Sequence, residues 1–344
     1  MVWAWVRGSA HLFCCLVESM TLQLAIRSYA FSLTRPLQTA SGVWQRREGW
    51  LLRLSCSISG RVGWGEVAPL DPQHRPACAR VITRWENPGG VEFHRDQLEA
   101  LLPTLPAEVG FGLGASLAEL DGDVQAWLPA PSSACLLPAG PAMLPMLDQL
   151  LATHPVGEPI TMKWKVAAAD FDQEWSLLSC LLDRLPPEAR LRLDANAGWD
   201  RTEADRWAGV LAGDPRLDWL EQPLAVDDLQ GLEDLGQRVP VALDESLLKQ
   251  PALREQWRGW QVRRPLLEGD PRLLLHQLQE GRPRLMFSTV FETGIGFRWL
   301  ALMAGLQQRG PTPAAPGLAP GWCPQGRLFS SDPEQVWVAA ELGG

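Results

Sequence analysis

Residues 160–166 read Ile-Thr-Met-Lys-Trp-Lys-Val, a short apolar run that carries Lys163 and Lys165. Four similar runs follow, each with a titratable residue at its end: Leu193-Asp194-Ala195-Asn196, Trp219-Leu220-Glu221-Gln222-Pro223, Leu243-Asp244-Glu245-Ser246 and Gln261-Val262-Arg263-Arg264-Pro265. Successive runs are roughly 20 to 30 residues apart, the length of one strand–helix unit. The carboxyl ends of the strands of a parallel barrel share one face, where active sites are built. The pattern predicts that these titratable residues lie together there.

Strand and helix patterns alternate from about residue 133 onward. Strands are expected at 134–137, 160–166, 190–194, 217–221, 239–244, 260–264, 284–288 and, more weakly, 317–319; helices are expected at 172–185, 202–211, 247–257, 272–279 and 295–307. This alternation requires parallel strands joined by right-handed crossovers. With about eight strands, a closed (β/α)8 barrel of the TIM type is favoured over an open sheet.

The segment before the barrel has a different pattern, typical of a small α+β domain. Antiparallel strands are expected at 22–33, 49–57 and 62–68, with turns at 35–36, 41–42 and 59–60 and helices at 96–101 and 114–127. Residues 1–19 include an apolar run at 12–17 that faintly resembles a signal peptide but lacks a convincing cleavage site. Because Met20 directly precedes a strand pattern, a misassigned start codon is favoured over a targeting peptide. We expect residues 1–19 to be a non-native or disordered extension.

Composition excludes several classes of protein. The length of 344 residues suits a barrel with an additional domain, and the net charge of −9 argues against nucleic acid as a partner. No run of about 18 apolar residues is present to span a membrane. The seven cysteines are scattered without a CxxC pair, as expected for reduced thiols in a cytoplasmic protein, and suggest no zinc site.

The three carboxylates Asp194, Glu221 and Asp244 carry the chemical prediction. One such residue at a strand end is commonly only a cap for the next helix. Three on consecutive strands, each after an apolar run, favour a shared metal. Carboxylate oxygens are the ligands that Mg²⁺ prefers.

Lys163 and Lys165 alternate with Met162 and Trp164, so both lysines share one face of their strand. On a central strand that face points into the barrel, where a lysine is costly unless it is paired or functional. Neighbouring cations can lower the pKa of a lysine until it acts as a general base. The alternative is a strand at a solvent-facing edge.

In order and spacing, Lys-x-Lys, Asp-Ala-Asn, Glu-Gln-Pro and Asp-Glu-Ser resemble the enolase superfamily, whose members join an α+β capping domain to a modified (β/α) barrel. The stretches 63–70 (Gly-Trp-Gly-Glu-Val-Ala-Pro-Leu) and 111–113 (Phe-Gly-Leu) fit as well. The resemblance implies a capping domain over 20–130, a barrel with the active site over 131–322, and a segment 323–344 that returns to the capping domain. It also implies a lysine base beside Mg²⁺, a use that is known for this superfamily.

Within the superfamily the chain is most similar to the o-succinylbenzoate synthase family. The similarity rests on residues 287–296 (Phe-Ser-Thr-Val-Phe-Glu-Thr-Gly-Ile-Gly) and 264–269 (Arg-Pro-Leu-Leu-Glu-Gly). It implies a dehydratase of menaquinone or phylloquinone synthesis that acts on a small carboxylate. Lys165 would remove a proton and then protonate the departing hydroxyl. Lys163, Asn196 and Glu245 would support the metal ligands.

Arg264 departs from the family pattern, which has a lysine at this position. Arginine stays protonated and is a poor acid–base catalyst, but it supplies fixed positive charge. A racemase needs a base on both faces of the α-carbon, whereas a syn dehydration needs one. The change therefore weakens a dipeptide epimerase or N-acylamino-acid racemase, the first alternative, more than the dehydratase. The second alternative is a non-catalytic metal-binding barrel.

Substrate contacts are expected at the end of the seventh strand. Gly294 and Gly296 precede a helix whose backbone N–H groups could hold a substrate carboxylate. Ser288 and Thr289 lie on the same rim, although both also suit an ordinary turn. By analogy with the superfamily, the loop 34–42 should fold over the barrel mouth.

Overall fold

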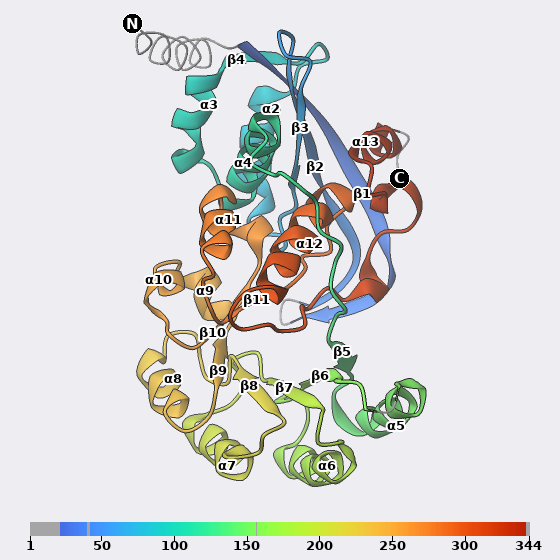
Figure 1. Cartoon of the computed structure of the whole chain (residues 1–344), viewed down its shortest axis with the longest axis vertical. Coiled ribbons are helices and arrows are strands. Elements are labelled where there is room, and N and C mark those ends of the chain that lie inside the picture. Colours follow the sequence, from blue (N-terminus) through green and yellow to red (C-terminus); the bar gives the residue numbers. More distant parts are fainter. Residues whose placement is uncertain (1–20, 40–41, 156, 342–344) are drawn as a thin grey trace, which may run out of the picture.

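The computed structural model of the chain describes residues 21–39, 42–155 and 157–341 (Figure 1). The extension expected at residues 1–19 lies outside these ranges. The chain forms a four-stranded antiparallel sheet and a seven-stranded parallel sheet, which lie in the upper and lower halves of Figure 1. This is the expected TIM-type barrel with an α+β domain before it.

The antiparallel sheet has the strand order β3-β2-β1-β4. Its strands are β1 (Thr21–Thr39), β2 (Gly42–Cys56), β3 (Val62–Val67) and β4 (Val91–His94). The segment expected as a loop over the barrel mouth is instead the end of β1, where Leu37 pairs with Trp44 of β2. The turn expected at Pro36 falls at a register irregularity between Ser32 and Leu37, which accommodates a residue that has no N–H to donate. The turn expected at 35–36 and the loop conformation expected at 34–39 were wrong, whereas the position of this segment over the barrel mouth stays a prediction.

Three helices cover one face of this sheet: α2 (Arg75–Trp85), α3 (Arg95–Leu101) and α4 (Ala107–Asp121). Strand β3 approaches α4 so closely that a Cβ atom on Gly65 would lie 1.8 Å from the carbonyl oxygen of Gly112. The helix expected at 114–127 is α4, which begins earlier, at Ala107, and ends earlier, at Asp121. Gly122, with a φ of +81°, stops it in the left-handed conformation that glycine adopts most readily.

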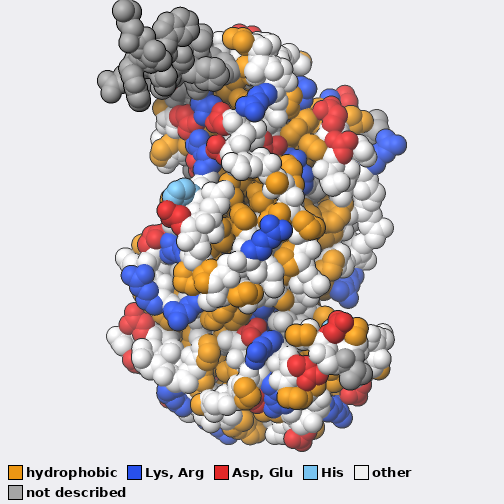
Figure 2. All heavy atoms as spheres, in the orientation of Figure 1, with side chains coloured by type: hydrophobic (Ala, Val, Ile, Leu, Met, Phe, Trp, Pro, Cys, Tyr) orange, Lys and Arg blue, Asp and Glu red, His pale blue; other side chains and the backbone are white. Residues whose placement is uncertain are grey.

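The other face of β1 and β2 packs against the end of the chain. Helix α13 (Pro333–Glu341) places Trp337 against Trp64, with ring centroids 5.6 Å apart, while Arg27 lies 4.5 Å from the centre of the Trp337 ring. On the face of the molecule in Figure 2, basic and acidic side chains are interspersed and hydrophobic side chains gather across the middle.

The parallel sheet runs in sequence order from β5 to β11. Its strands are β5 (Cys135–Leu137), β6 (Thr161–Lys165), β7 (Arg190–Asp194), β8 (Leu217–Glu221), β9 (Val241–Leu243), β10 (Trp260–Arg263) and β11 (Leu285–Phe287). The helices between and after them are α5 (Met143–Thr153), α6 (Phe171–Arg184), α7 (Arg201–Leu211), α8 (Leu229–Gly236), α9 (Glu245–Lys249), α10 (Leu253–Gln256), α11 (Arg272–Gln279) and α12 (Gly294–Gln308). No helix in the described part of the chain is long and apolar enough to cross a membrane.

Residues 316–318 close the ring where an eighth strand was expected. They form one parallel bridge, between Ser288 and Gly317. On one side the Gly317 N–H donates to the Phe287 carbonyl at 2.8 Å, and on the other the Ala134 N–H donates to the Pro316 carbonyl at 2.9 Å. This segment therefore joins β11 to the start of β5, although it is too short to count as a full strand.

The helix expected at 247–257 is broken into α9 and α10. Between them stand Gln250 and Pro251. Proline lacks an N–H donor and disfavours helical backbone in the residue before it, so the helix ends at Lys249 and restarts two residues beyond Pro251.

Alternation along the barrel strands separates an outer layer from an inner one. Met162 and Trp164 belong to the core that also contains residues of α6 and α7. Trp219, Ala242, Val262 and Met286 form a separate small cluster on the inner face. Below the carboxyl ends of the strands the interior therefore contains this apolar cluster, with Arg192 buried against Trp219, and it is charged again at the strand ends.

Glu66 of β3 connects the antiparallel sheet to the first turn of α12. Its carboxylate is fully buried and accepts hydrogen bonds from the Tyr29 hydroxyl at 2.6 Å, from the backbone and side chain of Thr293, and from the Gly296 N–H at 2.8 Å. Burial raises the pKa of Glu66, although these donors oppose the shift. A negative group at a helix N-terminus is also favoured by the helix dipole.

Glu292 lies beside Glu66 and is also fully buried. Its Oε2 accepts hydrogen bonds from the Thr289 hydroxyl and the Val290 N–H, both at 2.9 Å, whereas its Oε1 has no partner among the residues that the structure describes. Burial raises the pKa of Glu292 to about 7, and the nearby charge of Glu66 adds to the shift. The adjacent Phe291 has a φ of +63°, which is strained for a bulky side chain.

We expect Glu66→Ala to lower the free energy of unfolding by about 3 kcal/mol or more, because it leaves several buried donors without an acceptor. Urea unfolding measures this. Glu92→Ala, at an exposed position of β4, is the control and should change the value by less than about 0.5 kcal/mol. Equal losses for the two variants would contradict the role of Glu66.

Glu292→Gln should change how stability depends on pH. Between about pH 5 and pH 7 the folded protein holds a proton on Glu292 that the unfolded chain releases, so this group's contribution to stability falls as the pH rises. Glutamine does not titrate. Relative to the parent, Glu292→Gln should therefore gain roughly 2–3 kcal/mol between pH 5 and pH 8, measured by urea unfolding. A difference that is independent of pH would contradict this.

Candidate active site

The five strand-end residues lie on five neighbouring strands, in sequence order. Lys165, Asp194 and Glu221 end β6, β7 and β8 and are opposite one another in the register. Asp244 directly follows β9, and Arg264 directly follows β10. The structure therefore places all five at one rim, as the spacing predicts, because parallel pairing brings the strand ends to the same level.

Lys163 joins two of the carboxylates. Its Nζ lies 2.7 Å from Asp194 Oδ2 and 2.6 Å from Glu221 Oε1. Burial alone would lower the pKa of Lys163, but the two carboxylates outweigh burial and raise it well above its ordinary value. Lys163 is therefore held as a cation and is a poor candidate for a base.

Lys165 is placed differently from Lys163. Its side chain is half-buried on the same inner face of β6. Among the described residues it has no hydrogen-bond or ion-pair partner. Of the two lysines, Lys165 is thus the one whose ammonium group remains available to a ligand in the barrel mouth.

Arg264 is paired with Asp244 through both carboxylate oxygens. Its Nε donates to Oδ1 at 2.9 Å and its Nη2 to Oδ2 at 2.5 Å, while Nη1 donates to the Thr289 carbonyl at 2.9 Å. Burial would lower the pKa of Arg264, but Asp244 raises it further above its already high ordinary value. Arg264 carries a permanent charge in this site.

The acidic groups at the rim repel one another. Glu221 is fully buried, and burial raises its pKa; Lys163 opposes this shift, whereas the charges of Asp194 and Asp244 add to it. Burial and the same two aspartates raise the pKa of Glu245 to about 7. The region therefore holds more negative charge than it can keep without cations.

This donor set fits a hard divalent cation such as Mg²⁺. Asn196 donates to Glu245 Oε1 at 3.0 Å, yet Asn196 Oδ1 and Glu245 Oε2 are buried oxygens that have no partner within the described part of the chain. Across residues 21–39, 42–155 and 157–341, however, no three His, Cys, Asp or Glu side chains are disposed to hold a metal as they stand. Lys163 and Arg264 explain this, because they engage the carboxylates that would be the ligands.

The expected substrate contacts at the seventh strand need correction. The Gly296 N–H is already bonded to Glu66, and a Cβ atom on Gly294 would lie 2.0 Å from the Ser330 carbonyl oxygen. Both glycines pack the start of α12 against other parts of the chain; the Gly296 N–H is therefore not open to a substrate carboxylate, whereas a contact with the Gly294 N–H stays a prediction. The sequence did not reveal the role of Glu66, because its partners at the start of α12, Thr293 and Gly296, are more than 200 residues away.

Ser288 and Thr289 are both buried at the rim. The Thr289 hydroxyl donates to Glu292, and its carbonyl accepts from Arg264, so this residue supports its neighbours. The Ser288 hydroxyl has only a long contact of 3.5 Å to the Gly317 carbonyl. Ser288 therefore remains the better candidate for a substrate contact.

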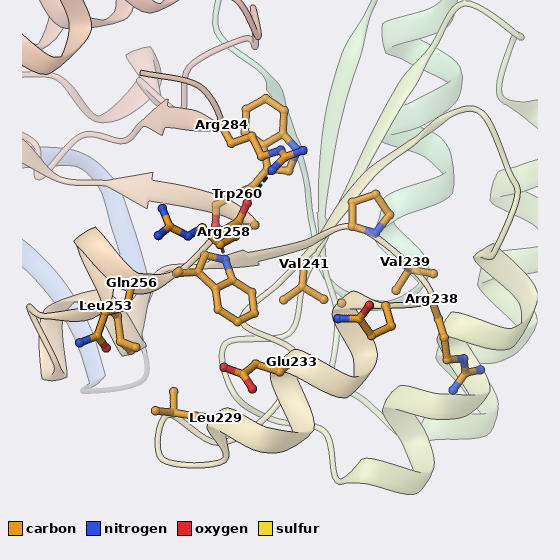
Figure 3. Close-up of a pocket in the computed structure, with 15 residues that line it drawn as sticks. Leu229, Glu233, Arg238, Val239, Val241, Leu253, Gln256, Arg258, Trp260 and Arg284 are labelled. Carbon is orange, nitrogen blue, oxygen red and sulfur yellow. Dashed lines mark hydrogen bonds between the residues drawn. The ribbon is translucent and has the colours of Figure 1, made fainter. Parts of the chain in front are cut away.

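A cavity lies at the opposite end of the barrel. It measures about 840 Å³ and is lined by residues before and at the start of β9 and β10, among them Val239, Val241 and Trp260 (Figure 3). In Figure 3 the side chain of Arg238 points away from it. None of the strand-end residues lines this cavity, and the charged rim is the better candidate site.

The chain matches known proteins along most of its length. Residues 160–256 match the family model for enolase C-terminal domain-like proteins. An o-succinylbenzoate synthase of Thermosynechococcus vestitus is 37% identical over 283 residues, which cover 78% of this chain and 84% of the relative. A protein of the same name from Edwardsiella ictaluri is 31% identical and covers 78% of this chain and 81% of its own length.

Solved structures show the same relationship. The crystal structure of o-succinylbenzoate synthase from Thermosynechococcus elongatus, complexed with magnesium in the active site, aligns with a TM-score of 0.76 and 31% identity, over 92% of this chain and 99% of that one. Muconate lactonizing enzyme from Pseudomonas fluorescens, at 19% identity and a TM-score of 0.63, shares the fold; the alignment covers 83% of this chain and 85% of that one. The chain belongs to the o-succinylbenzoate synthase family of the enolase superfamily.

Proposed function

We propose that this protein is a Mg²⁺-dependent carbon–oxygen lyase that dehydrates 2-succinyl-6-hydroxy-2,4-cyclohexadiene-1-carboxylate to 2-succinylbenzoate. The observation that carries the proposal is the 37% identity to a protein named o-succinylbenzoate synthase over 84% of that protein's length. The rim of three carboxylates, two lysines and one arginine supports it, because it supplies the charges that this reaction needs.

Asp194, Glu221 and Asp244 are the proposed metal ligands, by the chemistry of their oxygens and their convergence at one rim. When bound, Mg²⁺ supplies positive charge beside the substrate carboxylate and makes its α-proton more acidic. Lys163, Asn196 and Glu245 are the proposed supports of these ligands. The crystal structure of the related enzyme was obtained with magnesium in its active site, which supports the choice of metal.

Lys165 is the proposed base, because its ammonium group has no carboxylate partner in the described structure whereas Lys163 has two. In its neutral form Lys165 takes the proton α to the carboxylate. The electron pair of that C–H bond first passes to the carboxylate group, which becomes an enediolate, and it then forms the new ring double bond as the carbon–oxygen bond to the hydroxyl breaks. Lys165 returns the proton to the hydroxyl, which leaves as water from an aromatic ring.

Arg264 is the proposed source of fixed positive charge for the enediolate that forms when the proton is removed. It does not serve as a second base, since its pKa is raised by Asp244. One base is enough for a syn elimination, in which the same side chain removes the proton and protonates the leaving group. This arrangement favours dehydration over racemisation.

The wider assignment follows from this reaction. We place the enzyme in menaquinone or phylloquinone synthesis, with a small carboxylate as substrate. A cytoplasmic location remains part of the proposal and is supported by the scattered cysteines, since Cys78, Cys135, Cys180 and Cys323 form no disulfide.

Lys165→Ala should abolish dehydration while Mg²⁺ binding stays intact. Without the amine no group removes the α-proton, and we expect kcat to fall by about 10³-fold or more. Aromatisation followed by absorbance measures turnover, and calorimetry measures metal binding. Lys249→Ala, at an exposed position at the end of α9, is the control. Retained turnover in Lys165→Ala would contradict the assignment.

Removal of divalent cations should stop the reaction. A chelator is expected to abolish aromatisation, and Mg²⁺ in excess should restore it, because the carboxylate cluster cannot by itself stabilise a further negative charge. Exchange of solvent deuterium into the α-carbon of N-acylamino acids of both configurations, without dehydration, would indicate a racemase instead. Tight binding of the cyclohexadiene substrate without turnover would indicate a non-catalytic barrel.

A further inference from the structure

We propose that Arg264 competes with the divalent cation for Asp244, so that Arg264 sets the metal affinity of the site. The inference rests on the proposed role of Asp244 as a metal ligand. It concerns how the metal is held rather than which reaction follows.

The first observation is the geometry of the pair. The guanidinium group of Arg264 engages Asp244 through both carboxylate oxygens, at 2.9 and 2.5 Å, in the two-pronged arrangement that makes such pairs strong. The Asp244 side chain is almost fully buried, so water weakens the pair little. A metal ion that binds Asp244 must share a carboxylate oxygen with Arg264 or displace the guanidinium group from it.

The second observation is that Arg264 is fixed at several points. Its Nη1 donates to the Thr289 carbonyl at 2.9 Å, and its backbone N–H donates to Glu268 Oε1 at 2.8 Å. Glu268 is itself held by Arg263, whose Nε donates to Glu268 Oε2 at 2.8 Å. These contacts in the turn after β10 orient the Arg264 side chain toward Asp244, while the Arg263 side chain is paired with Glu268 instead.

The third observation concerns the other ligands. Asp194 and Glu221 share Lys163, which approaches them from β6, so Asp244 is the proposed ligand whose cationic partner comes from the opposite side of the cluster. A guanidinium group cannot reduce the conflict by losing a proton, whereas an amine can. Repulsion between Arg264 and a divalent cation therefore persists at every working pH.

The competition also connects metal binding to the position of Arg264. A guanidinium group released from Asp244 keeps its backbone anchor on Glu268 and gains free donors at the rim. These donors can then face a substrate carboxylate. A lysine at this position, as in the family pattern, offers one compact ammonium group and cannot engage both oxygens with a planar fork.

The test compares Mn²⁺ binding to the full-length protein, measured without substrate by electron paramagnetic resonance of the free ion. Arg264→Met should bind Mn²⁺ about tenfold more tightly than the parent or better, because a charge close to the cation is removed. Arg264→Lys should lie between them. Arg258→Met is the matched control and should bind like the parent, since Arg258 is exposed at the amino end of β10.

Thermal unfolding provides a second readout. After treatment with a chelator, Arg264→Met should melt at a lower temperature than the parent, because Asp244 loses its cationic partner, and Mn²⁺ should raise its melting temperature by more than it raises the parent's. Arg264→Lys keeps a positive charge and preserves the test if Arg264→Met fails to fold.

Equal or weaker Mn²⁺ affinity in both Arg264→Met and Arg264→Lys would overturn the inference, and so would the absence of Mn²⁺ binding in every variant. Because substrate is absent, these results do not depend on turnover. If the parent and its variants bind Mn²⁺ in the expected order but the parent never aromatises the substrate, the proposed function is disproved and the competition still stands.

Discussion

Mutual repulsion among buried carboxylates is the constraint on which this site depends. Parallel pairing places Asp194 and Glu221 opposite each other and brings Asp244 to the same rim, two residues beyond the partner of Glu221, Ala242. Burial makes that repulsion expensive, as the raised pKa of Glu221 shows. Two cations offset this repulsion: Lys163 lies on one side of the carboxylates and Arg264 on the other. The charged rim is therefore a direct consequence of the topology together with the choice of residue at each strand end.

The layers below and above the rim isolate this charge. Beneath it, Trp219 and its apolar neighbours fill the barrel, and Arg192 stacks 4.0 Å from the centre of the Trp219 ring while it donates to Asp218 and to the Ala315 carbonyl. On another side, Glu66 fastens the antiparallel sheet to the first turn of α12. Both devices supply hydrogen bonds to a buried charge, which is the condition for keeping an ion inside a protein, although Arg192 Nη2 has no partner in the described part of the chain.

Much of this could be read from the sequence, and the reasons are local. β7 and β8 have the bounds that their apolar runs predict, because each run ends on a charged residue at the rim. The errors have local causes as well: Pro251 divides a helix, and the extension of β1 past Pro36 depends on pairing with β2. The contacts of Glu66 with Thr293 and Gly296 were beyond reach, because they join segments that only the folded chain brings together. Spacing placed Arg264 near Asp244 but could not show that the guanidinium group takes both carboxylate oxygens.

The pairing of Arg264 bears on why a one-base reaction tolerates arginine at this position. A base must exchange protons near neutral pH. A guanidinium group stays protonated at that pH, above all when it is paired with a carboxylate. A site that needed bases on both faces of the substrate would lose its reaction with this change. A site that uses Lys165 alone loses nothing in proton transfer and gains a planar donor with several hydrogen bonds to offer. The disadvantage is a lower metal affinity, because the planar pair of N–H donors that suits a carboxylate substrate also suits Asp244. Arginine at position 264 is thus compatible with dehydration to the extent that the cation can draw Asp244 away from it.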